Sequence, residues 1–186
     1  MNNENYWEKF VTSVGLITTR GENGDDIMAA AWTYQISYEP GLIAVCIGPN
    51  KMTAENIDKN KEFGLHLAST EQNILSSIAG GNSGKKIDKI KVLESLGYNF
   101  FKAKKIKALM IKNTALAVEC KLKDKIVLGD HIMYVGEVIF VHDEGDGNEP
   151  LAYRTGKYFG LNETIKKPDD AKLKEINTLI KKYHKE

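Results

Sequence analysis

The chain lacks the features that mark membrane, disulfide-bonded or nucleic-acid-binding proteins. Among its 186 residues are only two cysteines and four prolines, and no apolar run is long enough to span a bilayer. It has 26 basic and 25 acidic residues, so its net charge of +1 creates no field that would favour nucleic acid. The N-terminus, MNNENYWEKF, lacks the basic-then-apolar order of a signal peptide. We therefore expect a cytoplasmic protein that binds neither membranes nor nucleic acid.

Several motifs of catalysis and nucleotide binding are also absent. The sequence has no G-x-G-x-x-G, no G-x-x-x-x-G-K-[ST] and no G-x-S-x-G, which removes the usual signals for dinucleotide-binding, phosphate-loop and hydrolase folds. The four histidines are scattered, so we predict no metal site. Cys46 and Cys120 lie in apolar runs without a C-x-x-C pattern. Buried free thiols in a reducing cytoplasm are the simplest interpretation of the two cysteines.

The most informative stretch spans residues 28–56. Residues 28–37 are uncharged and rich in apolar and aromatic side chains, which predicts a strand, and residues 38–41 (YEPG) predict a turn. Leu42–Ile47 predicts a short buried strand. Residues 48–50 (GPN) break it, and a helix is expected over residues 54–61 with Thr53 as its N-cap.

This break and helix start form a candidate anion site. The glycine of the break, the ammonium group of Lys51, the hydroxyl of Thr53 and the N–H groups of the helix could converge on one negative group. The alternative is an ordinary hairpin followed by a capped helix. The residues alone leave both interpretations open.

The rest of the chain predicts short strands with a few helices around them. Ser69 and Gln72 have the spacing of a capping box, residues 80–84 predict a loop, and residues 85–96 predict a helix. A turn is expected at residues 123–125 and a long strand over residues 126–142, bent at Gly129 or Gly136. After Pro168, a final helix should align its apolar residues on one face; these are Leu173, Ile176, Leu179, Ile180 and Tyr183. Together these elements predict an antiparallel Greek-key barrel with peripheral helices.

Three parts of the chain resemble the flavin reductase-like, FMN-binding split-barrel family, which includes flavoredoxins, ferric reductases and NAD(P)H:flavin oxidoreductases. Residues 26–32 (DIMAAAW), 37–41 (SYEPG) and 51–53 (KMT) resemble its N-x-M-T-x-x-W, S-x-E/D-P-P and K-x-T segments in order. Residues 129–138 (GDHIMYVGEV) resemble its G-D-H…G-E-V strand. Residues 150–159 (PLAYRTGKYF) resemble its P-L-x-Y…G-x-Y-F segment. The resemblance covers roughly residues 8–160.

The resemblance implies a mainly β fold, a Greek-key split β-barrel with a few peripheral α-helices and a C-terminal helix. Residues 1–165 would form the FMN-binding domain. Residues 166–186 would form the helix, packed on the barrel or on a dimer partner. A homodimer with flavin near the subunit interface is implied.

The resemblance also implies a set of cofactor-binding residues. The backbone of residues 28–32 would border the flavin ring, the N–H groups of residues 46–48 would face the ring edge, and Lys51 and Thr53 would hold the phosphate. The complete set is Met28, Ala29, Ala30, Ala31, Trp32, Cys46, Ile47, Gly48, Asn50, Lys51, Thr53, Tyr153 and Arg154. Ala29 and Ala31 stand where many members have Thr and Ser.

Three of the side chains, those of His131, Trp32 and Arg154, have two interpretations each. His131 could contact the nicotinamide or its phosphates, or could fix the end of a strand. Trp32 could border the flavin or belong to the core. Tyr153 and Arg154 could cover the flavin or its phosphate from the partner subunit, although Arg154 could equally form an exposed salt bridge.

The resemblance implies an oxidoreductase that passes electrons from NAD(P)H through bound FMN to free flavin, a ferric chelate or a partner protein. The alternative is a flavoredoxin-like electron carrier, or flavin-binding module, without its own nicotinamide site. A third hypothesis, from a different class, is a haem- or nucleotide-binding barrel without redox turnover. The sequence leaves open the electron acceptor and the choice between NADH and NADPH.

Overall fold

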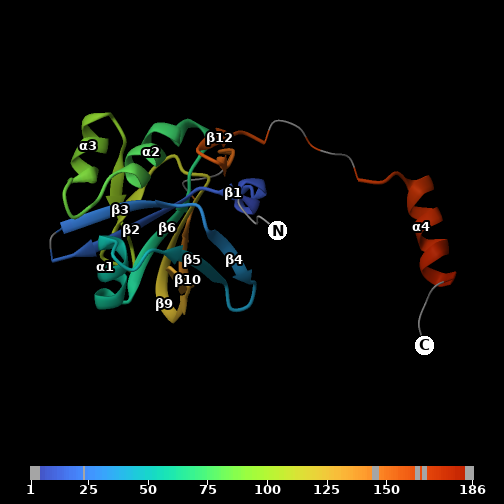
Figure 1. Ribbon diagram of the computed structural model, residues 1–186, viewed down its shortest axis with the longest axis horizontal. Coiled ribbons are helices and arrows are strands. Elements are labelled where there is room, and N and C mark those ends of the chain that lie inside the picture. Colours follow the sequence, from blue (N-terminus) through green and yellow to red (C-terminus); the bar gives the residue numbers. More distant parts are fainter. Residues whose placement is uncertain (1–4, 23, 144–146, 162–163, 165–166, 183–186) are drawn as a thin grey trace.

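The computed structural model describes residues 5–22, 24–143, 147–161, 164 and 167–182. Most of the chain forms antiparallel strands (Figure 1). The strands are β1 (Thr12–Ser13), β2 (Gly15–Gly21), β3 (Gly24–Ala30), β4 (Thr33–Ser37), β5 (Leu42–Ile47), β6 (Glu62–Leu67), β7 (Phe100–Lys102), β8 (Leu109–Ile111), β9 (Leu116–Leu128), β10 (His131–His142), β11 (Ala152–Arg154) and β12 (Lys157–Phe159). The α-helices are α1 (Met52–Asn60), α2 (Asn73–Gly81), α3 (Lys89–Ser95) and α4 (Asp170–Lys182), and the short 3-10 helices are η1 (Tyr6–Lys9) and η2 (Thr70–Gln72).

Seven strands form one curved sheet in the order β3-β2-β6-β9-β10-β5-β4. Its two edge strands, β3 and β4, follow each other in the chain, so the sheet nearly returns on itself. The sheet does not close, and the architecture is the predicted mainly β split barrel. A small sheet of β1, β11 and β12 and a pair of β7 and β8 lie beside it. The connection from β5 to β6 contains α1, which packs mainly against β2 and also contacts β3.

The chain bends sharply where β3 passes into β4. The predicted single strand over residues 28–37 is therefore wrong, because Ala31 and Trp32 belong to neither strand. The Thr33 hydroxyl donates a hydrogen bond to the carbonyl of Ala30 (3.0 Å), and the Cys46 amide donates one to the carbonyl of Trp32 (2.9 Å). Gly15 permits this bend, because a Cβ atom there would lie 2.1 Å from the Thr33 hydroxyl oxygen.

The side chains along the strands alternate between two main hydrophobic cores. On β2, Ile17 faces the inside of the barrel, where Ala54 and Ile57 of α1 close one end of the core. Its neighbour Leu16 faces outward, into a second core with Ile27, α2 and α3. Because successive residues of a strand point to opposite faces, β2 and β3 contribute to both cores. The α1 and α2 helices therefore pack on opposite faces of the sheet at β3. The start of α1 and the end of α2 both lie beside β3.

Other predicted elements require correction. The helix over residues 85–96 is shorter, since only Lys89–Ser95 is helical, and the predicted loop at residues 80–84 begins later, because α2 continues through Gly81. Residues 123–125 form no turn, and the single strand predicted over residues 126–142 is wrong, because β9 continues to Leu128, a turn lies at residues 129–130 and β10 begins at His131. A shift of register at Gly136 accommodates one extra residue of β9, a β-bulge at one of the two predicted bends. The capping box is confirmed by the bond from the Ser69 amide to Gln72 (3.1 Å).

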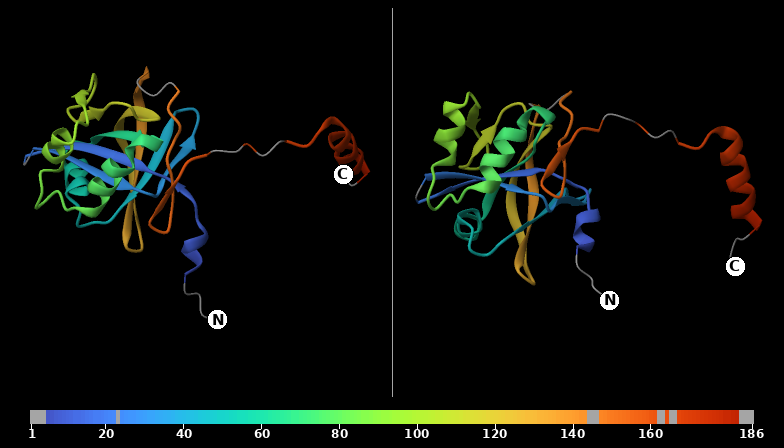
Figure 2. Two further views of the ribbon diagram at one scale, coloured as in Figure 1. Left: turned by 90° about the horizontal axis from the view of Figure 1, so that it is seen from above. Right: turned by 45° about the horizontal axis from the view of Figure 1, so that its top comes forward.

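The C-terminal helix α4 lies apart from the barrel (Figures 1 and 2). Leu173, Leu179 and Ile180 are exposed there. Tyr183, the last residue of the predicted apolar face, lies outside the described residues. Packing of this helix on the barrel or on a partner therefore stays a prediction. In the part of the chain that the structure describes, none of the helices combines the length and the apolarity needed to cross a bilayer.

Candidate functional site

The first element of the site is the start of α1, at the open edge beside β3. Lys51, rather than the predicted Thr53, is the N-cap, and its side chain makes no capping bond. The N–H groups of the first helical turn have no partners within the helix, and their partial positive charge attracts an anion. The Lys51 side chain folds back beside Gly48, where a Cβ atom would lie 3.9 Å from its Cε and Cγ. This end of the helix therefore offers amide donors and one ammonium group.

The hydroxyl of Thr53 has a different partner from the one predicted. It donates a hydrogen bond to the Asp26 carboxylate (2.7 Å, to Oδ2), and the other oxygen of that carboxylate lies 3.1 Å from the Nζ atom of Lys89. The side chains of Asp26 and Lys89 are each only 3% exposed. These three residues tie β3, α1 and α3 together beneath the anion site.

A small cavity of about 20 Å³ opens at this point, with room for a water-sized group. Its wall combines β3, the start of α1 and the segment that follows α2. Its lining residues are Asp26, Met28, Lys51, Met52, Thr53, Ala79, Gly80, Asn82, Ser83, Gly84 and Lys89. This space holds about one water molecule, so any ring system must lie outside it.

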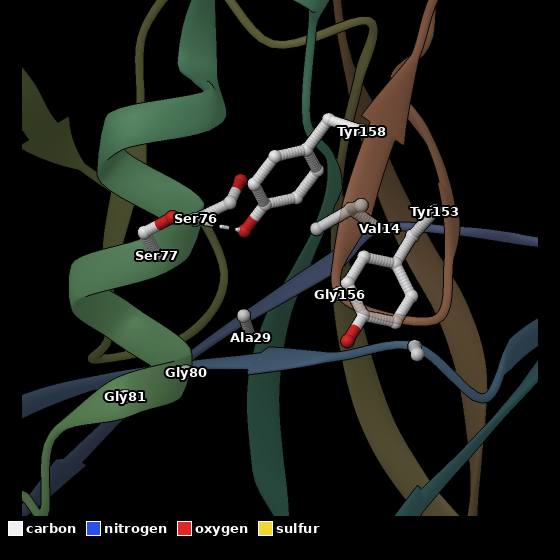
Figure 3. A pocket seen from close by; sticks show the side chains of 10 residues that line it. Val14, Ala29, Ser76, Ser77, Gly80, Gly81, Tyr153, Gly156 and Tyr158 are labelled. Carbon is white, nitrogen blue, oxygen red and sulfur yellow. Dashed lines mark hydrogen bonds between the residues drawn. The ribbon is translucent and has the colours of Figure 1, made fainter.

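A larger cavity of about 400 Å³ adjoins the first, and Gly80 lines both (Figure 3). Tyr153 and Tyr158 face α2 across it, and the Tyr158 hydroxyl lies 3.2 Å from the Ser77 hydroxyl. The lining residues are Val14, Ala29, Ala31, Ser76, Ser77, Gly80, Gly81, Tyr153, Gly156 and Tyr158. A Cβ atom at Gly80 would lie 3.3 Å from the Cβ of Ala29, so the glycine lets the helix approach β3 closely. The cavity has apolar and aromatic walls with hydroxyl groups at the rim, which suits a flat heteroaromatic ring.

The rings of Trp32 and His131 contact each other, and Trp32 directly follows Ala31, which lines this cavity. Their ring centroids are 4.6 Å apart with an interplanar angle of 51°, and Trp32 is 45% exposed, which excludes it from the core. His131 also bonds through Nδ1 to the Asp130 carboxylate (2.8 Å). This hydrogen bond lowers the pKa of Asp130. The carboxylate orients the imidazole, whose Nε2 atom is then the nitrogen that can meet a ligand.

The three predicted backbone donors of residues 46–48 are not equivalent. The Cys46 amide already bonds to Trp32, and Ile47 is paired with Ile132 of β10. Because alternate N–H groups along a strand point to the same side, the Gly48 amide points the same way as that of Cys46, beyond the end of β4. Gly48 is thus the donor best placed for a ligand at the open edge.

The two cysteines are free, as expected, but only Cys120 is fully buried. Burial raises the pKa of the Cys120 thiol to about 12, and the nearby Glu119 carboxylate adds to this effect. Cys46 is half-buried, contrary to prediction, and burial raises its pKa as well. Neither thiol is a ready nucleophile near neutral pH.

The structure gathers most of the predicted site residues along the edge of β3, but not all of them. Tyr153 reaches the larger cavity within the same chain, whereas Arg154 lies over the Phe159 ring (6.0 Å) and does not line the cavity. Asn50 is exposed in the turn, and the side chain of Ala30 is buried in the barrel core, so that residue can offer only its backbone.

Sequence reasoning missed one wall of the larger cavity. Ser76, Ser77, Gly80 and Gly81 come from α2, and Tyr158 comes from β12. The available signal was the pair of glycines, which permit close approach of a backbone to a ligand or strand but were read as loop residues. Tyr158 lay within the resembling segment and was not assigned a role.

The half-open sheet places the chain in the split-barrel fold class. The sequence model of the flavin reductase like domain matches residues 7–162, so the chain belongs to the flavin reductase-like family.

Individual proteins are similar to this chain in sequence or in fold. The NADH-dependent FMN reductase AsuE2 of Streptomyces nodosus subsp. asukaensis is 23% identical over 155 residues, which cover 82% of this chain and 80% of that protein. The crystal structure of an FMN-binding protein from Thermus thermophilus superposes with a TM-score of 0.78 at 22% identity, covering 89% and 94% of the two chains. A flavoredoxin from Methanosarcina acetivorans gives a TM-score of 0.77 at 21% identity, covering 90% and 92%. At these identities the two structures show the fold alone.

Proposed function

We propose that the protein binds FMN at the edge of β3 and passes electrons from NAD(P)H through it to an acceptor. One observation carries the proposal: an uncapped helix start with Lys51 adjoins, through Gly80, a cavity large enough for a flat ring. FMN has a phosphate at one end and a ring system at the other, which matches this order of small polar and large apolar spaces. Membership of the flavin reductase-like family supports the choice of flavin.

The residues fit the cofactor by the chemistry of their donors. The α1 amides and the Lys51 ammonium would hold the phosphate, since a dianion combines well with a helix N-terminus. The backbone of residues 28–32 and the amide of Gly48 would border the ring, with Tyr153 and Tyr158 on the far side of the cavity. FMN, when bound, supplies the redox chemistry; the protein binds it, orients it and keeps water away from it.

His131 and Trp32 would receive the nicotinamide. The Trp32 ring is half-exposed and could carry a second planar ring, while the Nε2 atom of His131, whose Nδ1 donates to Asp130, would accept a hydrogen bond. The name of the relative AsuE2 supports NADH as the reductant. The acceptor would be free flavin, a ferric chelate or a partner protein.

The absorption spectrum under anaerobic conditions tests the proposal. Purified protein mixed with FMN should retain the cofactor through gel filtration, and NADH or NADPH should then bleach the flavin band without any other protein. Retention of FMN without bleaching by either nicotinamide would instead favour a flavoredoxin-like carrier. Failure to retain FMN would refute the flavin site itself, and with it both versions of the function.

We also propose a cytoplasmic homodimer. Tyr34 and Ile36 on the edge strand β4, and the apolar residues of α4, are exposed in the single chain and would be covered by a second copy. The free thiols suit a reducing compartment. A monomer in sedimentation at micromolar concentration, with flavin bound, would contradict the dimer.

A further inference from the structure

A buried carboxylate lies where the proposed phosphate site should be positive. Asp26 lines the small cavity together with Lys51 and the start of α1. Its oxygens are occupied by the Lys89 ammonium at 3.1 Å and the Thr53 hydroxyl at 2.7 Å. Gly84 packs on the same carboxylate, since a Cβ atom there would lie 2.2 Å from Oδ1. The carboxylate is therefore enclosed on three sides.

An uncompensated carboxylate at this position would oppose phosphate binding. Like charges in a poorly solvated site repel strongly, and a buried carboxylate without a partner is itself unfavourable. Lys89 prevents both the repulsion of the phosphate and the cost of an unpaired buried carboxylate, because its charge balances that of Asp26. The Lys51 ammonium is then the excess positive charge of the site. Glu55, a second acid in the first turn of α1, is paired with Lys85 in the segment between α2 and α3, and that pair is exposed.

We infer that Lys89 is a positioning residue that gives the site its preference for a phosphorylated flavin. The inference rests on the proposed function, and its geometric basis is the buried chain of contacts from Lys89 through Asp26 to Thr53. Lys89 acts by neutralising Asp26 and by fixing Thr53 in the first turn of α1, so that the helix amides and Lys51 present net positive charge to the ligand. Lys89 itself need not touch the phosphate.

The test compares FMN with riboflavin, which has the same ring but no phosphate. Dissociation constants for both are measured by flavin fluorescence for the wild type, Lys89→Met, Asp26→Asn and the double variant, with thermal unfolding recorded in parallel. Lys91→Met is the matched control, because Lys91 lies on the same helix but pairs with Asp88 at the surface.

Lys89→Met should lower the preference for FMN over riboflavin about tenfold, because it leaves the negative charge of Asp26 uncompensated beside the phosphate. The double variant should regain most of this preference, because it removes the uncompensated carboxylate. Asp26→Asn should increase the preference, because it leaves the Lys89 ammonium as a second excess positive charge. If Lys89→Met does not fold, an unchanged preference in Asp26→Asn would overturn the inference. Lys91→Met should behave as the wild type.

A purely structural role for the pair predicts a different pattern. In that case Lys89→Met, Asp26→Asn and the double variant would all lower stability and weaken both ligands by the same factor, which would overturn the inference. A wild type that binds both flavins with a clear preference for FMN, while Lys89→Met keeps that preference, would overturn the inference and leave the proposed function standing. A wild type that binds neither flavin would overturn both.

Discussion

Replacement of Lys51 by methionine tests the phosphate end of the site. The change keeps most of the side-chain stem over Gly48 and removes the ammonium group. A hydrogen bond to a charged group contributes about 1.5–3 kcal/mol, which corresponds to a ten- to hundredfold change in affinity. Lys51 is exposed at the N-cap of α1, so solvent and salt screen its charge. We therefore expect the lower end of this range, about a tenfold loss of FMN affinity at low ionic strength.

The assay is the ratio of FMN and riboflavin dissociation constants, measured by fluorescence titration at low and high salt. Riboflavin binding should hardly change in Lys51→Met, and the difference between the two proteins should shrink as salt is added. Lys121→Met, at an exposed position of β9, is the control for a general loss of positive charge. Equal losses for both ligands, or an unchanged FMN affinity, would show that the phosphate lies elsewhere.

Three further predictions concern single side chains. Thr53→Val should lower the free energy of unfolding by about 1–3 kcal/mol in chemical denaturation, because it removes a donor to the buried Asp26; an unchanged midpoint would contradict that bond. His131→Ala should raise the KM for NAD(P)H and leave FMN affinity unchanged, whereas lower thermal stability with normal kinetics would mean that the residue is structural. Burial lowers the pKa of His66 to about 4, below its ordinary value of 6.5, so its folded form stays neutral while the unfolded chain takes up a proton. The wild type should thus lose about 3 kcal/mol of stability as pH falls from about 6.5 to 4, a slope that His66→Gln should flatten.

The sequence predicted best the elements whose signals are local. Leu42–Ile47 forms the expected strand, because an apolar run with β-branched residues lies between a Pro-Gly turn and a Gly-Pro break. The turn expected at residues 123–125 is wrong because their charges, read as a turn signal, lie on the exposed part of a long two-stranded ribbon. The strand expected over residues 28–37 is wrong because its break at Ala31 depends on contacts with Thr33 and Cys46 that its composition does not reveal.

The same difference between local patterns and contacts distant in sequence applies to the candidate site. The stretch from Lys51 to Thr53 could be recognised from its residue types and their spacing. The pairing of Asp26 with Lys89 joins residues 63 positions apart on different elements, so no local pattern could predict it. The same Asp26 carboxylate accepts the hydrogen bond of the Thr53 hydroxyl, which was expected to bind the phosphate. The wall formed by α2 was missed because its glycines end a helix rather than form a loop.

The proposed function requires that this chain binds FMN and reduces it with a nicotinamide. Anaerobic stopped-flow mixing of the FMN-loaded protein with NADH, and separately with NADPH, measures this reduction. One nicotinamide should bleach the flavin band in a single turnover, with a rate that saturates as its concentration rises. A flavin band that stays unchanged with both nicotinamides, in a protein that still holds FMN, would contradict it.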